Sequence, residues 1–441
     1  MSIRKMLFWT HLVAGCVAGA IVLVMSLTGV LLTYERQILA RVERGPFRSD
    51  PPSGSAKHLP VEELLGKIRE QRGSLPPGAS VTLRSDPREP VELSAGRDDT
   101  LYIQPYTGQI LGKPPAEGWR TFFQKVTAWH RWLGATGEGR TSAKAITGAC
   151  NLAFLVLIVT GPFLWLPKQW TRRHLGPITW FRGGLSGKAR DFNWHNVFGI
   201  WLAVPLFFVV LTAVPMSYQW GNNLIYQLTG TEPPAGGRGG PGTPGGEGRG
   251  GRGGRGGAEF GAGRPARRNG GEGRGDRASR EAAGGQERRA KEEVERPAET
   301  EVLAGLNEFW ARAESQIRGW RSIAMRVPDN PRRPLVFTID SGDGGQPQKR
   351  ATLTLDRDGG AARLETFADL NAGRRIRSWS RFVHTGEAYG TVGQTIAGAA
   401  SFAGVMLVWT GISLSLRRFA AWRRKRSCII ETELVQASGG D

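Results

Sequence analysis

Four of the six histidines stand at the ends of apolar stretches, where an imidazole could bind a metal or a cofactor within a membrane. His11 and His195 open apolar runs, whereas His130 and His384 precede two others. A polar side chain in hydrocarbon needs a partner or a function, because leaving it unsatisfied costs several kcal/mol. Two imidazoles that face each other across helices suit the two axial positions of a haem iron.

The two histidines that open apolar runs belong to a repeat. A Gly, a Thr and a Tyr follow at equal offsets, as Gly15, Thr28 and Tyr34 after His11 and as Gly199, Thr212 and Tyr218 after His195. Matched offsets indicate two copies of one structural unit. A glycine one turn after each histidine would let a flat macrocycle approach the backbone. Close helix packing through a GxxxG pattern explains Gly15 and Gly19 equally well.

Four apolar runs are long enough to cross a bilayer, because about 20 helical residues span its hydrocarbon core. Basic residues cluster in the loop at 168–193 and in the tail at 417–441. The positive-inside rule therefore places both termini in the cytoplasm, as in a multi-pass protein of the bacterial inner membrane if the source is Gram-negative. The two long segments between spans then lie in the periplasm.

These long segments predict two small α+β modules. In the first, apolar residues at helical spacing from Val61 to Ile68 precede short strand patterns, and a similar order recurs in the second. The Gly/Arg-rich stretch between them is too polar to fold, and its outer location argues against a nucleic-acid partner. The predicted membrane spans are a transmembrane helix at 7–34, a second at 143–167, a third at 194–220 and an outer segment with the fourth at 384–416. The predicted outer parts are a first α+β module at 35–118, an amphipathic segment at 119–142, a disordered insertion at 233–292 and a second module at 299–380. The predicted cytoplasmic parts are a basic loop at 168–193 and a tail at 417–441.

The fold class expected is thus an α-helical membrane protein with four transmembrane helices in two repeated pairs and two small α+β periplasmic modules. Zinc is an alternative occupant of the histidine pairs, but it usually takes a third or fourth protein ligand that neither group offers. His58 is interpreted as a solvated loop residue and His174 as part of a basic cluster facing lipid headgroups. The three cysteines are scattered and form no CxxCH motif for covalent haem attachment.

Several motifs resemble the PepSY-associated transmembrane family, whose members include inner-membrane ferric-siderophore reductases and iron-regulated membrane proteins. They are KMLFWTHLVAG, SLTGVLL, PVEELLGKIRE, LYIQPYTGQILG, FFQKVTAWHRWLG, IVTGPFLWLPK, FNWHNVFGIW and HTGEAYG. The resemblance implies two non-covalent b haems. His11 and His195 would hold the cytoplasmic-side haem iron, and His130 and His384 the outer one. It assigns no further catalytic residue.

By the same resemblance, the chain would be a membrane haem-dependent ferric reductase. It would pass electrons from quinol, or from a separate cytoplasmic reductase, to a periplasmic ferric siderophore. The loop and tail are too short to fold a flavin or nicotinamide domain of their own.

Two other functions remain open. PepSY modules also occur in protease propeptides, so the chain could be an anchored regulator of a peptidase. An iron or siderophore permease would need polar groups near the bilayer midplane, and the spans carry few.

Overall fold

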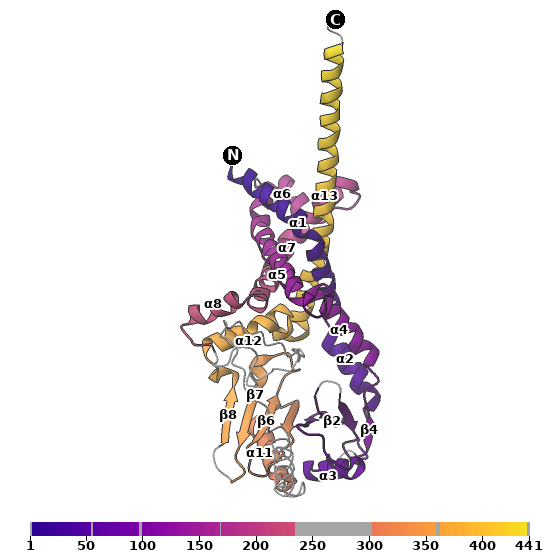
Figure 1. Ribbon diagram of the computed structural model, residues 1–441, viewed down its shortest axis with the longest axis vertical. Coiled ribbons are helices and arrows are strands. Elements are labelled where there is room, and N and C mark those ends of the chain that lie inside the picture. The colour runs from indigo at the N-terminus through magenta and orange to yellow at the C-terminus, as the bar shows by residue number, and fades with distance from the viewer. Residues whose placement is uncertain are drawn as a thin grey trace, which may run out of the picture.

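The computed structural model describes residues 2–53, 56–96, 99–167, 169–233, 302–358 and 362–438, without the side chains of 425 and 427–438. Nearly all of the predicted 233–292 insertion lies outside these residues. The molecule is elongated, with a bundle of long helices at one end and a β-sheet domain at the other (Figure 1). Both ends of the chain lie at the bundle end. We call this end the termini side and the opposite end the sheet side.

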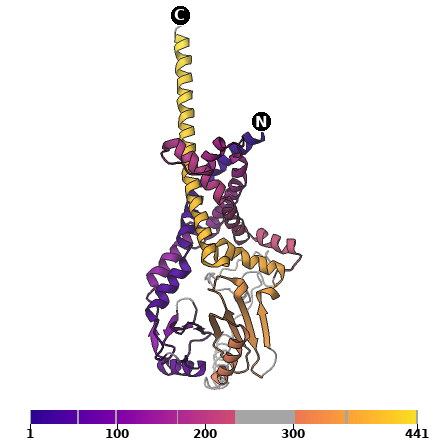
Figure 2. The ribbon, with the colours of Figure 1, turned by 180° about the vertical axis from the view of Figure 1, so that it is seen from behind.

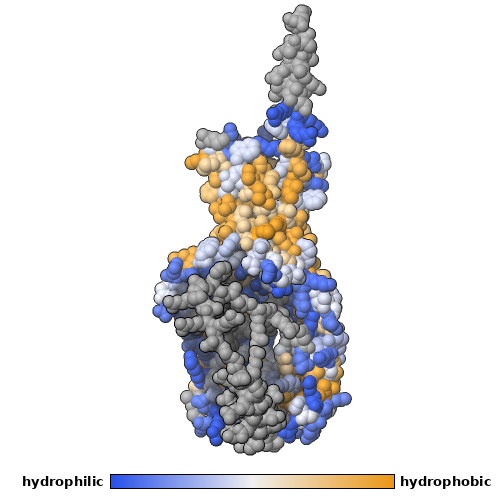
Figure 3. Space-filling model, in the orientation of Figure 1, coloured by the Kyte–Doolittle hydropathy of each residue, from blue (hydrophilic) through white to orange (hydrophobic). Residues whose placement is uncertain are grey.

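Four helices form the bundle, and each is long and apolar enough to cross a membrane. They are α1 (Ile3–Leu32), α5 (Gly139–Trp165), α7 (Gly187–Ser217) and α13 (Gly390–Ser438). α1 packs against α5 and α13, and α7 packs against the same two helices, so α1 and α7 face each other across the bundle. On the face shown in Figure 3, an apolar band crosses the bundle between two more polar ends. The four predicted spans are therefore confirmed as helices.

Five shorter helices and four 3-10 turns connect the bundle to the sheet or flank it. The helices are α2 (Glu35–Arg44), α4 (Glu117–Trp132), α6 (Arg172–Thr179), α8 (Gln219–Thr229) and α12 (Ala372–His384), and the turns are η1 (Gly45–Phe47), η2 (Pro347–Lys349), η3 (Phe367–Asp369) and η4 (Glu387–Tyr389). α2 and α4 lead to one side of the sheet, and α12 leads to the other (Figure 2).

Two helical segments extend beyond the predicted transmembrane spans. Residues 35–44, expected within the first outer module, form α2 and continue the direction of α1 toward the sheet. The predicted tail from residue 417 is helical up to residue 438 as part of α13. Between Gly411 and Gly439 the sequence contains no Gly or Pro, so nothing in the local sequence ends the helix there.

The strands form one antiparallel sheet in place of two separate modules. Its order is β4-β3-β2-β1-β5-β6-β7-β8. The strands are β1 (Ser80–Arg84), β2 (Val91–Ser94), β3 (Thr100–Ile103), β4 (Ile110–Gly112), β5 (Ser322–Arg326), β6 (Leu335–Asp340), β7 (Arg350–Leu355) and β8 (Ala362–Thr366). Each half supplies four consecutive strands, and the halves join where β1 pairs with β5. This pairing forms backbone hydrogen bonds along two strand edges that would be unpaired in isolated modules.

One hydrophobic core serves both halves of the sheet. α3 (Val61–Arg72) and α11 (Leu306–Gln316) contact each other and contribute to the same buried cluster as the strands. The apolar face predicted for the first helix is buried, with Leu64, Leu65 and Ile68 fully inaccessible. The two helices are also linked reciprocally. The Glu62 amide donates to Asn307 Oδ1 (3.1 Å), and the Asn307 amide donates to Glu62 Oε1 (2.9 Å).

We expect Asn307→Ala to lower the free energy of unfolding of the sheet domain by about 1–2 kcal/mol, because the Glu62 amide loses its acceptor at the seam between the halves. Urea denaturation of the full chain in detergent, followed by far-UV circular dichroism, measures this change. Ser315→Ala is the control, since the exposed Ser315 hydroxyl bonds only within its own helix, to Arg312. Equal midpoints for the two variants would contradict a stabilising link.

Candidate functional site

The four predicted histidines lie together as two pairs inside the bundle. His11 of α1 faces His195 of α7, with ring centres 6.4 Å apart. His130 at the end of α4 faces His384 at the end of α12, with ring centres 6.2 Å apart. We call the first the inner pair and the second the outer pair. The partners within each pair are those that the repeat and the expected topology predicted.

The two pairs occupy different depths of the bundle. His130 contacts the carbonyl of Met25 on α1, and His384 contacts the carbonyl of Val209 on α7. Met25 lies 14 positions after His11, and Val209 lies 14 positions after His195. At 1.5 Å per helical residue, the inner and outer pairs are thus about 21 Å apart along the helices. The inner histidine and the backbone carbonyl that contacts the outer histidine are thus equally spaced on α1 and on α7, as the sequence repeat predicts.

Each inner histidine bonds a threonine from a neighbouring helix. His11 Nδ1 lies 2.9 Å from Thr160 Oγ1 of α5, and His195 Nδ1 lies 2.9 Å from Thr410 Oγ1 of α13. Each threonine also donates its single hydroxyl proton back to its own helix, at 2.8 Å to the Val156 carbonyl and 2.6 Å to the Met406 carbonyl. A hydroxyl has one proton to give, so toward the imidazole each threonine must accept.

This arrangement fixes the protonation of the inner rings. Nδ1 carries the proton and donates it to threonine, so Nε2 on the far edge of the ring keeps a free lone pair. Metal-binding histidines usually show this pattern, in which the second nitrogen donates to an oxygen and thereby orients the ring.

In the outer rings Nδ1 also carries the proton, but it donates to a backbone carbonyl. His130 Nδ1 lies 3.0 Å from the Met25 carbonyl and 3.0 Å from Thr28 Oγ1, whose own proton goes to the Val24 carbonyl. His384 Nδ1 lies 2.7 Å from the Val209 carbonyl. A carbonyl oxygen only accepts, so Nδ1 must be the donor in both rings. In the neutral form of all four imidazoles the proton is therefore on Nδ1, and Nε2 has the free lone pair.

The spacing within each pair fits two imidazoles on opposite sides of one metal ion. A nitrogen–metal bond of about 2 Å places such rings with their centres about 6 Å apart once the half-width of each ring is added. Of the two glycines one turn after the inner histidines, Gly199 packs against Leu407, whose Cδ2 a Cβ there would meet at 3.6 Å, so only Gly15 is open. A Cβ added at Gly15, one turn after His11, would meet nothing within 4 Å. Gly19 instead packs against Ile412 and Val408 of α13, so close helix packing accounts for one glycine of the GxxxG pattern and open space for the other.

The donor set is that of a two-ligand site. Within the described part of the chain, no group of three or more His, Cys, Asp or Glu side chains lies close enough to hold a metal ion. Two trans imidazoles without further protein ligands match an ion whose remaining positions are filled by a macrocycle, as in bis-histidine haem. The residues present thus fit haem better than they fit zinc.

Sequence reasoning overlooked the threonines that hold three of the rings. The sequence patterns assign no histidine partner to Thr28, Thr160 or Thr410, and Thr28 enters the prediction only as a residue of the repeat. A signal was present, since each is followed directly by glycine, as Gly29, Gly161 and Gly411. A Cβ at these glycines would lie 3.7 Å, 3.9 Å and 3.4 Å from the Cε1 atoms of His130, His11 and His195, respectively. The Thr-Gly dipeptide therefore supplies an acceptor and clears space at the ring edge.

The remaining two histidines lie elsewhere. His174 is exposed, and its Nδ1 lies 2.7 Å from Thr171 Oγ1 at the start of α6. His58 was expected to be a solvated loop residue; it lies in a loop but is only partly exposed. Its ring packs edge-on to Tyr106 with centres 5.4 Å apart, and its Nε2 is buried. The loop containing His58 folds back on the β3–β4 turn through a backbone bond from Leu59 to Pro105, which covers the ring.

A buried carboxylate lies one helical turn before the inner histidine of α7. Asp191 is 1% exposed and accepts hydrogen bonds from Ser413 of α13 (2.6 Å) and from Arg190 (2.9 Å). Arg417 of α13 lies 3.6 Å away. Asp191 therefore ties α7 to α13 next to the point where His195 meets Thr410.

The outer pair is linked to the sheet domain through a glycine-rich loop at 341–349. Arg36 of α2 donates to the Asp343 carbonyl in this loop and pairs with Glu387 of η4 at 3.3 Å. Gln348 Nε2 donates to the Ala388 carbonyl at 3.1 Å. These contacts connect the loop to η4, which follows α12 and His384 directly. The sheet domain is thus held against the outer pair.

Comparison with known proteins agrees with this architecture. A search of curated proteins finds no match. The family model described as the PepSY-associated TM region matches residues 8–418. This match covers nearly the whole chain and includes both histidine pairs. The chain therefore belongs to the PepSY-associated transmembrane family.

Proposed function

We propose that this protein is a di-haem electron-transfer protein of the bacterial inner membrane that reduces ferric iron, held by a siderophore, on its sheet side. The observation that carries the proposal is the arrangement of four imidazoles as two pairs at two depths of an apolar bundle, each with Nδ1 bonded and Nε2 free. Two redox sites at different depths of the bundle would allow electrons to cross a bilayer in steps. The sheet side is then periplasmic and the termini side cytoplasmic.

The inner pair would hold one b haem and the outer pair the other. Each bound haem supplies reversible one-electron Fe(III)/Fe(II) chemistry. The chain contains no CxxCH motif, so attachment would rest on axial ligation and packing alone. The threonines and carbonyls at Nδ1 hold each ring in orientation and strengthen its donor atom.

The packing between the pairs excludes water. Ala18 and Val22 of α1 and Leu206 of α7 belong to one buried cluster with residues of α5 and α13, and they lie in sequence between the inner and outer positions. A low-dielectric interior of this kind, together with ligation, sets the relative stability of the two iron oxidation states.

The sheet side suits an anionic ferric complex. α12, which ends at His384, carries Arg374, Arg375, Arg377 and Arg381. A run of cationic side chains attracts negatively charged solutes to this region. One-electron reduction lowers the charge density of the bound iron, so hard oxygen donors of a siderophore hold Fe(II) far more weakly than Fe(III). The reduction would thereby release iron in the periplasm.

The electron donor would be quinol or a separate cytoplasmic reductase. Purified protein in liposomes tests the proposal directly. Haem pre-reduced with dithionite should be reoxidised by an added ferric siderophore, with a ferrous chelator capturing the product. Haem that is present but not reoxidised by any ferric complex would contradict the proposed substrate while leaving the electron-transfer role intact.

We expect Thr410→Val to weaken haem retention at the inner pair by about 10–100-fold, because His195 Nδ1 loses its acceptor and the ring its orientation. Haem titration of the apo-protein measures the affinity, and Thr410→Ser should restore it. Thr212→Val is the matched control, since Thr212 bonds only the Phe208 and Val209 carbonyls of its own helix. Equal effects of the two valine variants would contradict a specific role for Thr410.

A further inference from the structure

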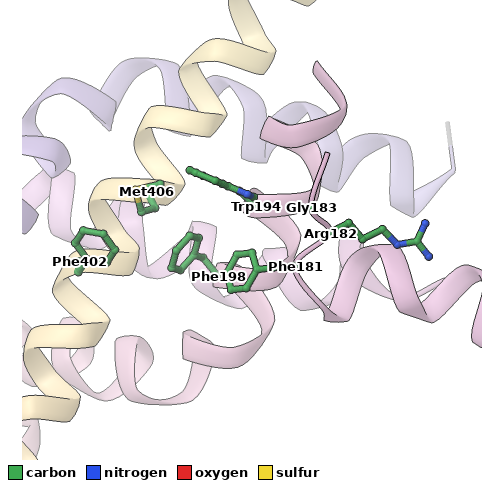
Figure 4. A pocket seen from close by; sticks show the side chains of 7 residues that line it. All are labelled: Phe181, Arg182, Gly183, Trp194, Phe198, Phe402 and Met406. Carbon is green, nitrogen blue, oxygen red and sulfur yellow. The ribbon is translucent and has the colours of Figure 1, made fainter. Parts of the chain in front are cut away.

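A pocket of about 390 Å³ lies between α7 and α13 beside the inner pair. Its walls are Phe181 and Gly183 of the α6–α7 loop, Trp194 and Phe198 of α7, and Phe402 and Met406 of α13 (Figure 4). The aromatic side chains contact one another edge to face, with ring centres 5.1 Å apart for Phe181 and Phe198 and 6.1 Å apart for Phe198 and Phe402. The pocket is therefore a slot with flat, apolar walls.

The pocket opens toward the lipid. Phe402, in the middle of a membrane-spanning helix, is 48% exposed, and Phe181 is 55% exposed. A ligand would therefore enter from the bilayer. Arg182 also lines the pocket, but its side chain runs away from the ring cluster (Figure 4). The Arg182 guanidinium therefore does not point into the pocket. Without this positive charge, the apolar pocket fits a neutral ligand better than an anionic one.

The pocket is next to the inner histidines. Trp194 directly precedes His195, and Met406 lies one turn from Thr410, which bonds His195. The pocket and the inner pair therefore lie on adjacent faces of α7, a helix about 10 Å across. Arg190 stacks its guanidinium over the Trp194 ring at 5.4 Å and so restrains the wall. Trp194 also offers an indole N–H that can donate to a quinol or quinone oxygen.

From these observations we propose that the pocket binds the head ring of an isoprenoid quinol and is the site where electrons enter the protein. This inference rests on the proposed function and names its donor. A flat, neutral ring with a lipid-soluble tail matches the aromatic walls, the lateral opening and the volume, which falls within the ordinary range of small-molecule sites.

The reaction balances with the ferric substrate. Oxidising one quinol to quinone breaks its two O–H bonds and releases two protons and two electrons. Two ferric ions on the sheet side accept one electron each. The protons leave on the termini side, where the α6–α7 loop forms the end of the slot.

A second pocket, near Lys5, Met6, Trp9 and Thr10, is the structural competitor. Its lining comes from a single stretch of α1, so it is a surface hollow without an opposing wall. The pocket between α7 and α13 has walls from three elements, namely α7, α13 and the loop between α6 and α7. The two locations can be separated by experiment.

A photoreactive azido-quinone with a short tail, added to the purified full-length protein, tests the site. Peptide mapping should place the label on Trp194 or Met406, and excess decylubiquinone should remove it. Phe402→Trp fills the slot and Phe402→Ala opens its wall, so both should reduce labelling to background. Phe208→Trp is the control, because Phe208 is 49% exposed on the same bundle but does not line the pocket. Labelling near Trp9, or equal labelling of all variants, would overturn the assignment.

Haem measurements on the same variants separate this inference from the proposed function. The Phe402 variants should keep the wild-type haem content and full reduction by dithionite, while reduction by decylubiquinol becomes much slower. Loss of haem from Phe402→Trp would show that the pocket belongs to the haem site and would overturn the quinol assignment. A wild-type protein that labels in the pocket but contains no haem would refute the proposed function alone.

Discussion

Purified His195→Ala protein is expected to contain about one haem per chain where the wild type contains about two. His195 and His11 form the inner pair, with ring centres 6.4 Å apart, so the substitution would leave the proposed inner haem with only one of its two protein ligands. A non-covalent haem held on one side only dissociates during purification. The outer pair shares no residue with the inner one, and its haem should remain. The pyridine haemochrome assay, with haem counted per polypeptide, measures the loss.

The reciprocal variant completes the test. His384→Ala should remove the outer haem and keep the inner one, so the two variants should leave haems with different spectra or midpoint potentials. His174→Ala is the control, because His174 is exposed and bonds only Thr171. Equal loss of both haems in both variants would count against two separate sites.

Arg350→Leu is expected to lower the free energy of unfolding of the sheet domain by about 3–5 kcal/mol, because it leaves a buried carboxylate without its counter-ion. Asp340 is 5% exposed, and Arg350 Nε lies 2.7 Å from its Oδ2. Arg350 also donates to the Gly344 carbonyl in the 341–349 loop. Urea denaturation followed by far-UV circular dichroism measures the change, since helices in detergent resist urea better than the sheet does.

The matched control is Arg333→Leu. Arg333 pairs with Asp329 at 2.9 Å on the same domain, but the two side chains are 67% and 61% exposed. An exposed pair contributes little, so this variant should stay within about 0.5 kcal/mol of wild type. If the two arginine variants lost equal stability, the buried pair would have no special role. Because the loop contacts Arg36 and η4, Arg350→Leu should also broaden the optical spectrum of the outer haem and leave that of the inner haem unchanged.

The depth of each histidine in the bundle was predictable because it depends on features within single helices, and the pairing followed from the expected topology. Equal offsets after His11 and His195 fix their depth, and the alternation of spans fixes which side His130 and His384 approach from. Apolar length likewise predicted the four long helices. Such signals are local, and hydrophobic periodicity reports them directly.

What the sequence could not predict depends on contacts between distant segments. Thr160 and Thr410 bond histidines 149 and 215 positions away, and a threonine within a span carries no mark of the partner it meets. Strand patterns predicted short strands in both outer segments, but such patterns say nothing about which strand lies at an edge. The joining of the halves through β1 and β5, and the link between Glu62 and Asn307, therefore emerged only from the structure.

The reduced-minus-oxidised visible spectrum of detergent-purified protein, produced with ample haem supply and with haem quantified per chain, tests the central claim most directly. We predict a b-type spectrum and about two haems per chain, with both lost when all four paired histidines are replaced. A protein that is folded but contains no haem would contradict the electron-transfer account. It would favour the alternative in which the sheet domain binds a periplasmic peptidase and the helices serve as its anchor.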